Sequence, residues 1–196
     1  MTCAEGVAYG PPPARFDVDE VERAAEAWNF NCGPGAVCGL LEMLPEELRP
    51  YLFDFEAKGY TNPTLMFGIL RRLEQIGAIR GWSSSPFVSS CMKSLAWPGF
   101  GLCRIQWAGP WTRPGVPVAA RYRKTHWVAS WRSPWALETM IFDINAACVG
   151  GWISLAEWSQ KLVPWLLREC EPKATGEWWI THAITVIPTQ MAVNGD

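Results

Sequence analysis

The spacing of apolar residues changes once along this chain, and that change limits the possible folds more than any other feature. In the first part, apolar residues recur at helical spacing, which predicts a helix from Pro63 to Ile76 that Gly77 ends. A Ser-rich loop is expected over residues 83–90. After it, the apolar runs are short, β-branched or aromatic, and bounded by Gly or Pro, as is typical of strands. These runs cover residues 102–107, 127–131, 139–144 and 178–187. Helices followed by an antiparallel sheet predict the α+β class.

Three more helices are expected. Residues 17–28 are a candidate for a short polar helix, and residues 32–45 for a buried one, in which Pro34 suits the first turn and the final proline stops the run. A late helix over residues 154–165 begins with Ser and Glu at capping-box spacing, and its Pro164 should kink or end it.

Length and charge set the class of protein. With 196 residues the chain is expected to hold one domain, over residues 16–196, after a flexible N-terminal arm of residues 1–15 that carries three consecutive prolines. Seventeen Lys and Arg against nineteen Asp and Glu give a net charge of -2, which argues against a nucleic-acid partner. The longest uncharged stretch, residues 178–195, is too polar to span a bilayer, so no membrane partner is expected. No basic start precedes an apolar segment near the N-terminus, and a cytoplasmic location is the expectation.

Cysteine usage favours reduced thiols. The chain has an odd number of cysteines, no C-x-x-C pair and only two histidines, so neither a disulfide framework nor a structural zinc site is expected. The cysteines are Cys3, Cys32, Cys38, Cys91, Cys103, Cys148 and Cys170.

One of these cysteines has the setting of a nucleophile. Cys32 lies at the N-terminal edge of an expected helix, where free N–H groups and the partial positive charge favour a thiolate. Gly33 and Gly35 leave backbone room beside it for a substrate carbonyl to approach. A thiolate nucleophile also needs a base and a group that holds this base in the correct tautomer.

A base and its partner occur in the expected sheet. His126 begins one strand, and Asp143 and Asn145 end the next, two residues apart, so they would share a face if the strand continued. Either of these two could accept a hydrogen bond from the imidazole, and Asp143 would also stabilise its charged form.

This ordered set resembles a known family. Cys-Gly-Pro opens a helix at Cys32, a later strand begins His-Trp-Val at His126, and the next strand ends in Asp seventeen residues on, which looks like the papain-like cysteine peptidases. The C39-like branch, which includes the bacteriocin-leader-processing enzymes, is the most similar, over about residues 26–187. The resemblance implies a papain-like fold in which Cys32 is the nucleophile, His126 the general base and Asp143 its orienter. It implies a peptide or protein substrate and no metal or organic cofactor.

The chain departs from the family at the oxyanion donor. Six residues before the nucleophile the family has Gln, and this chain has Glu26, whose carboxylate cannot donate unless it is protonated. Asn29 or Asn31 could replace the missing donor, together with the Cys32 N–H. Losing one such donor typically slows an enzyme about 10²–10³-fold. The family's Asp-Pro is Asp143-Ile144 here, which removes a rigid residue but no reacting group.

Other residues receive plainer interpretations. Cys38, inside the expected helix, and His182, on a strand, are interpreted as structural, and the basic segment 121–124 as a solvent-facing loop. Large amphipathic aromatic residues often line clefts as well as cores. The tryptophans considered as walls of a substrate cleft are Trp107, Trp111 and Trp127.

The leading functional hypothesis is hydrolysis of a peptide or amide bond through a thioester. Two alternatives stay open. The same three residues would serve an acyltransferase, a transglutaminase-like enzyme or a deamidase, since the shape of the cleft selects the acceptor. A catalytically inactive papain-like binding module is the other alternative, and Glu26 is the feature that supports it.

Overall fold

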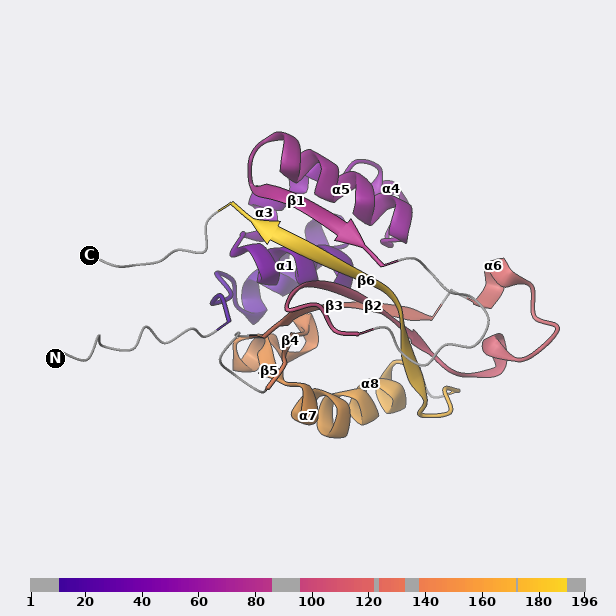
Figure 1. Cartoon of the computed structure of the whole chain (residues 1–196). Coiled ribbons are helices and arrows are strands. Elements are labelled where there is room, and N and C mark those ends of the chain that lie inside the picture. The colour runs from indigo at the N-terminus through magenta and orange to yellow at the C-terminus, as the bar shows by residue number, and fades with distance from the viewer. Residues whose placement is uncertain (1–10, 86–95, 122–123, 133–137, 172, 190–196) are drawn as a thin grey trace, which may run out of the picture.

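A computed structural model describes residues 11–85, 96–121, 124–132, 138–171 and 173–189. Over these residues the chain forms an antiparallel sheet of six strands in the order β1-β6-β2-β3-β4-β5 (Figure 1). The strands are β1 (Ile79–Ser84), β2 (Phe100–Trp107), β3 (Thr125–Trp131), β4 (Met140–Phe142), β5 (Trp152–Ser154) and β6 (Trp178–Pro188). With the helices described next, this confirms the predicted α+β class and its antiparallel sheet.

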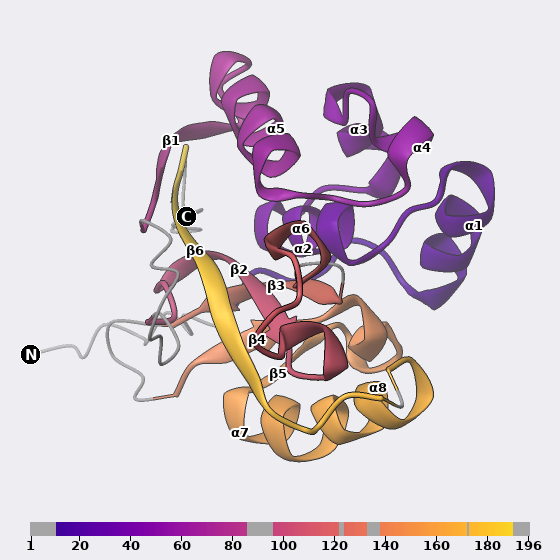
Figure 2. The same ribbon diagram turned by 90° about the vertical axis from the view of Figure 1, so that its right-hand side faces the viewer.

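Helices cover both faces of the sheet. Helices α1 to α5 gather on one side, and α7 and α8 lie on the other (Figures 1 and 2). The α-helices are α1 (Val18–Trp28), α2 (Cys32–Leu41), α3 (Pro45–Leu48), α4 (Phe55–Lys58), α5 (Pro63–Gln75), α6 (Val118–Arg121), α7 (Leu155–Glu157) and α8 (Val163–Glu169). Short 3₁₀ segments cover Arg49–Tyr51, Pro110–Thr112 and Ile144–Val149, and a π-helical turn covers Trp158–Leu162.

Successive side chains of the central strands belong in turn to two hydrophobic cores, one on each face of the sheet. Leu102 and Trp127 pack with the α1–α5 side, whereas their neighbours Cys103 and Val128 pack with the α7–α8 side. Successive side chains of a strand point to opposite faces, so each central strand contributes to both cores. The sheet therefore separates the two cores and contributes side chains to both.

Three glycines let α2 pack closely against its neighbours. An added Cβ would lie 2.2 Å from the Thr61 hydroxyl oxygen at Gly33, 2.7 Å from an Ile144 methyl at Gly35, and 2.5 Å from the Phe142 ring at Gly39. The expectation that Gly33 and Gly35 leave room for a substrate carbonyl is wrong, because Thr61 and Ile144 fill that space. These glycines serve packing, and they bring the start of α2 to the end of the sheet.

Several element bounds differ from the sequence expectation. The helix that begins at Cys32 ends at Leu41, because Glu42 takes a left-handed conformation with φ +54°, and the proline at 45 begins α3. Strand β1 includes residues 83 and 84, where a loop was expected, and residues 86–90 of that loop lie outside the described residues. Neither β1 nor β5 was expected.

The late helix is interrupted rather than ended. A π-helical turn over Trp158–Leu162 joins α7 to α8, and Pro164 lies in the first turn of α8. A proline lacks the N–H that a helix interior needs, but it fits a first turn, where that N–H has no partner within the helix.

The N-terminal arm is described only from residue 11. Residues 11–15 form no helix or strand, yet the Arg15 guanidinium donates to the Glu42 carbonyl and the Glu47 carboxylate, each at 3.1 Å. Phe16 follows, buried in the core. The last residues of the expected flexible arm are therefore held against the α2–α3 connection.

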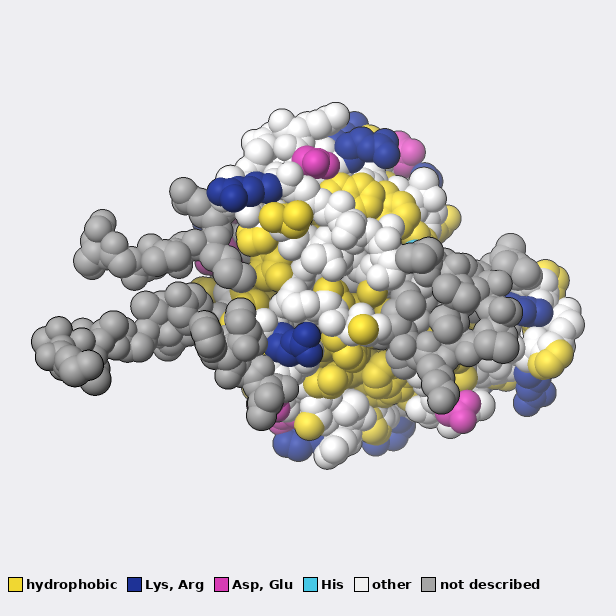
Figure 3. Space-filling view, in the orientation of Figure 1, with side chains coloured by type: hydrophobic (Ala, Val, Ile, Leu, Met, Phe, Trp, Pro, Cys, Tyr) yellow, Lys and Arg dark blue, Asp and Glu magenta, His cyan; other side chains and the backbone are white. Residues whose placement is uncertain are grey.

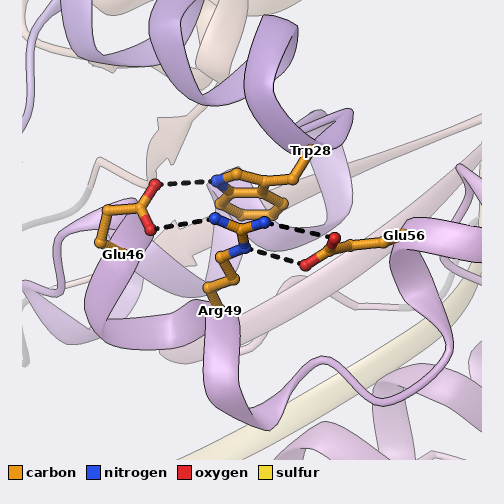
Figure 4. A network of polar contacts seen from close by, with 4 residues as sticks. All are labelled: Trp28, Glu46, Arg49 and Glu56. Carbon is orange, nitrogen blue, oxygen red and sulfur yellow. Dashed lines mark hydrogen bonds and ion pairs between the residues drawn. The ribbon is translucent and has the colours of Figure 1, made fainter.

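A polar network joins the first helices (Figure 4). The Trp28 indole of α1 donates to Glu46 of α3 at 2.9 Å, and Arg49 donates to both oxygens of Glu56 in α4, at 2.8 and 3.3 Å. The Arg49 guanidinium also lies 5.7 Å from the Trp28 ring centroid, a cation–π distance. The network fixes the end of α1, four residues before Cys32.

Among the described residues, no helix has both the length and the apolar character that a membrane span requires. On the face in Figure 3, described hydrophobic side chains gather over the middle, and Lys and Arg side chains are scattered around them.

Candidate active site

The sulfur of Cys32 lies at the first residue of α2. Asn31 caps this helix: its side-chain oxygen accepts from the Gly33 N–H at 3.2 Å, and its amide nitrogen donates to the Gly59 carbonyl at 3.0 Å. The first N–H groups of a helix have no acceptor within it and favour negative charge nearby. The capped start of α2 thus presents the Cys32 thiol and its own N–H at one place.

His126 and Asp143 meet at the same end of the sheet. Strand β3 begins beside His126, antiparallel β4 ends just before Asp143, and the imidazole Nε2 lies 2.8 Å from Asp143 Oδ2. The imidazole also shares a hydrogen bond with the Cys32 thiol. Because Nε2 faces Asp143, Nδ1 is the nitrogen that faces sulfur. The structure therefore brings the three predicted residues into one hydrogen-bonded series.

Asp143 is fully buried, and four N–H donors surround its carboxylate. Oδ2 accepts from the imidazole and, at 2.9 Å, from the indole N–H of Trp158. Oδ1 accepts from the backbone and side-chain amides of Asn145, at 3.0 and 2.8 Å. The expectation of a continuing strand is wrong here, since β4 ends at Phe142 and Asn145 reaches Asp143 through a tight turn. Asn145 orients the carboxylate instead of competing with it for the imidazole.

The three groups favour their charged forms together. Burial alone would raise the pKa of the Cys32 thiol, but the charge and hydrogen bond of His126 and the N–H of Trp127 hold that pKa below its usual value. Burial would lower the pKa of His126, yet the Asp143 carboxylate and the Cys32 thiolate raise it well above its usual range. Burial opposes the Asp143 carboxylate too, and hydrogen bonds from His126 and Trp158 keep the pKa of Asp143 low. Both shifts are in the direction that a thiolate–imidazolium pair requires.

A pocket of about 380 Å³ opens onto this series between α1 and α8, which Figure 2 shows on the same side of the molecule. Val21 and Phe30 line it near α1, and Leu166, Cys170 and Glu171 line it near α8. Its remaining lining residues are Asn31, Cys32, Trp107, Thr125, His126, Ile144 and Asn145. The walls are mostly apolar, and the polar groups converge near the sulfur, as in many small-molecule and peptide sites.

Of the three tryptophans considered for the cleft, only Trp107 lines this pocket, and it stacks on His126 with ring centroids 6.1 Å apart. Trp111 is not among the lining residues, and it donates its indole N–H to the Trp107 carbonyl at 2.7 Å. The expectation for Trp127 is wrong: its side chain is buried in the α1–α5 core and donates to the Thr61 carbonyl. Trp127 reaches the site only through its backbone N–H.

The three candidates for the oxyanion donor differ in whether they line the pocket. Glu26 is exposed on α1 and does not line the pocket. Asn29 is also exposed, and it ends α1 in a left-handed conformation with φ +63°. Asn31 is the one of these three that lines the pocket, next to Cys32.

The residues interpreted as structural lie away from the pocket. Cys38 is fully buried in α2, and burial and the charge of Glu47 raise its pKa well above the usual value. His182 lies on β6 beside Phe67, and burial together with the charge of Arg104 lowers its pKa to about 4.

Sequence reasoning missed Trp158 as a site residue. The helical spacing identified it as an apolar position, and the only local hint was Pro164, which predicted an irregular helix at that point. The contact with Asp143 joins residues fifteen apart through the turn of the chain, so no short motif reports it.

In the part of the chain that the structure describes, no three His, Cys, Asp or Glu side chains gather in a way that could hold a metal ion. Comparison with protein-family models, curated proteins and solved structures found no match to this chain.

Proposed function

We propose that this protein is a papain-like thiol hydrolase that cleaves a peptide or amide bond through a thioester on Cys32. The observation that carries the proposal is the series Cys32–His126–Asp143, hydrogen-bonded throughout, with its sulfur at a capped helix N-terminus and facing a pocket. We further propose a peptide or protein substrate and a cytoplasmic location, where a reactive thiol stays reduced.

The chemistry follows from the charges in the series. The Cys32 thiolate attacks the carbonyl carbon, a C–S bond forms, and the carbonyl oxygen becomes an oxyanion. The His126 imidazolium gives its proton to the leaving amine, the C–N bond breaks, and a thioester remains. His126, now neutral, takes a proton from water, the resulting hydroxide displaces sulfur, and the acid leaves with the thiolate–imidazolium pair restored. Asp143 holds the imidazole in the required orientation throughout.

Two donors beside the sulfur suit the oxyanion. The Cys32 N–H begins α2 and lacks a partner within the helix. The Asn31 amide has two hydrogens, and one of them goes to the Gly59 carbonyl. Asn31 lines the pocket next to Cys32, so its second amide hydrogen is our candidate for the donor that the family's Gln supplies. Glu26, exposed on α1, has no part in this arrangement.

The rate of alkylation by iodoacetamide against pH tests the reactive pair, with each cysteine read by mass spectrometry in the wild type and in His126→Ala. We expect selective labelling of Cys32 well below pH 8 and loss of that selectivity in the variant. Exposed Cys148 serves as an internal reference, and Cys38, whose pKa burial raises, should stay unlabelled until the protein unfolds. A Cys32 that reacts no faster than Cys148 would refute the proposal and favour the binding module.

A separate experiment tests whether water or an amine accepts the acyl group from the thioester. The protein is incubated with a peptide library, with and without a primary amine, and the products are identified by mass. Hydrolysed peptides alone support the hydrolase, amine adducts indicate a transferase, and peptides 1 Da heavier with intact backbones indicate a deamidase.

A further inference from the structure

We infer that Trp158 is a positioning residue of this site, and that its indole N–H fixes the carboxylate that orients His126. The indole nitrogen lies 2.9 Å from Asp143 Oδ2, the same oxygen that accepts from the imidazole at 2.8 Å. The inference rests on the proposed function, because a positioning role has meaning only if the Cys32–His126 pair reacts.

Because Trp158 and His126 bond the same oxygen of Asp143, a change at the indole should affect the imidazole. Asp143 and Trp158 are both fully buried, so this hydrogen bond forms away from water, where an unpaired carboxylate lone pair is costly. Asn145 donates twice to Oδ1, whereas Trp158 donates to the other oxygen, Oδ2. With both oxygens fixed, the carboxylate cannot rotate away from the imidazole.

The backbone at Trp158 is irregular in a way that fits this task. Trp158 is the first residue of the π-helical turn that joins α7 to α8, and such turns often occur at functional sites. The Ser154 hydroxyl accepts from the Glu157 N–H at 3.1 Å and so fixes the start of this segment. The π turn thereby sets the direction in which the Trp158 indole leaves the helix.

Aromatic packing holds the indole in place. Its ring lies 5.0 Å from Trp178 and 5.8 Å from Trp97, both edge-to-face, and 6.5 Å from Trp107, nearly parallel. Trp107 in turn stacks on His126. The Trp158 indole is therefore enclosed by aromatic rings, and it is fully buried.

Trp158→Phe removes the N–H and keeps an aromatic ring. Trp178→Phe is the matched control, since it keeps a ring beside the same indole and Trp178 is not one of the four N–H donors to Asp143 described above. Alkylation of Cys32 is measured from pH 4 to 9 in both variants. Losing a hydrogen bond to a buried charge should raise the pH at which Cys32 alkylation reaches half of its maximal rate, by about one pH unit. Below that midpoint, labelling should be about tenfold slower than in the wild type. The control should keep the wild-type midpoint.

A second variant separates the N–H from the shape of the ring. Site-specific replacement of Trp158 by β-(3-benzothienyl)alanine substitutes sulfur for the N–H in a ring of nearly the same shape, so it covers the case in which Trp158→Phe fails to fold. An upward shift with this residue supports the inference. A wild-type midpoint overturns it and leaves the proposed function intact, whereas an ordinary Cys32 midpoint in the wild type overturns the proposed function itself.

Discussion

Replacing Gly39 by Ala tests whether the close approach of α2 to the sheet sets the geometry at Cys32. The added Cβ would lie 2.5 Å from two carbons of the Phe142 ring, whereas carbons in contact are usually about 3.5–4.0 Å apart. Helix or ring must therefore move by about 1 Å. The ring has little freedom to move, because Phe142 is fully buried and packs edge-to-face with Phe16 and Trp152.

Two effects of opposite sign determine the result. Overpacking of a core costs about 1–3 kcal/mol, and replacing a helical Gly by Ala recovers about 1 kcal/mol. Because three ring carbons are met at once, we expect a net loss of about 1–2 kcal/mol, which lowers the Tm of a domain of this size by about 2–8 °C. The helix shift should also move Cys32 relative to His126 and raise the pH midpoint of Cys32 alkylation.

Urea unfolding followed by far-UV circular dichroism measures the loss, and Gly68→Ala in α5 is the control. A Cβ at Gly68 would lie 3.2 Å from Phe53, a half-exposed ring that can move aside. That variant should be as stable as the wild type or up to about 1 kcal/mol more stable. If Gly39→Ala matches this behaviour and leaves Cys32 alkylation unchanged, the packing argument for α2 is refuted.

Two further predictions concern single side chains. Asn31→Ser keeps an oxygen that can cap α2 but removes the amide hydrogens, so acylation by p-nitrophenyl acetate should slow by about 10²–10³-fold. Iodoacetamide labelling of Cys32, which forms no oxyanion, should change little, and equal losses in the two assays would contradict the assigned role. His182 has a pKa of about 4 in the fold against about 6.5 when unfolded, so the unfolded chain binds more protons in that range and stability falls as the pH drops from about 6.5 to 4. In His182→Gln, the free energy of unfolding measured by urea titration should change less with pH over this range. An unchanged pH dependence would show that other groups cause it.

The sequence was sufficient for the elements with strong local signals. Helix α5 begins after Asn62, whose side chain caps it, and its apolar face repeats at helical spacing. The start of α2 and the order Cys32, His126, Asp143 could also be read directly, because capping and strand alternation are local properties. Whether these three side chains meet was not readable, since their contact depends on strand order.

The errors at β1 and at Gly33 and Gly35 have their cause in tertiary structure, whereas the error at Trp127 does not. Strand β1 contains Gly81 and three Ser or Trp residues, a poor strand signal, and it forms because β6 supplies its partner. The error at Trp127 was avoidable, since it follows His126 directly and neighbouring residues of a strand face opposite sides of the sheet. The roles given to Gly33 and Gly35 needed knowledge of what packs against α2.

The site combines groups from both sides of the sheet, and this lets two variants be told apart. Cys32 arrives with α2 from the α1–α5 side, whereas Trp158 holds Asp143 from the α7–α8 side, and His126 stands between them at the start of β3. Gly39→Ala should therefore displace the thiol and leave the His126–Asp143 hydrogen bond intact, while Trp158→Phe should disturb that bond and leave the start of α2 in place. The far-downfield proton resonance of the His126 Nε2–H reports the bond directly. It should persist in the first variant and shift or broaden in the second, because each core controls a different half of the series.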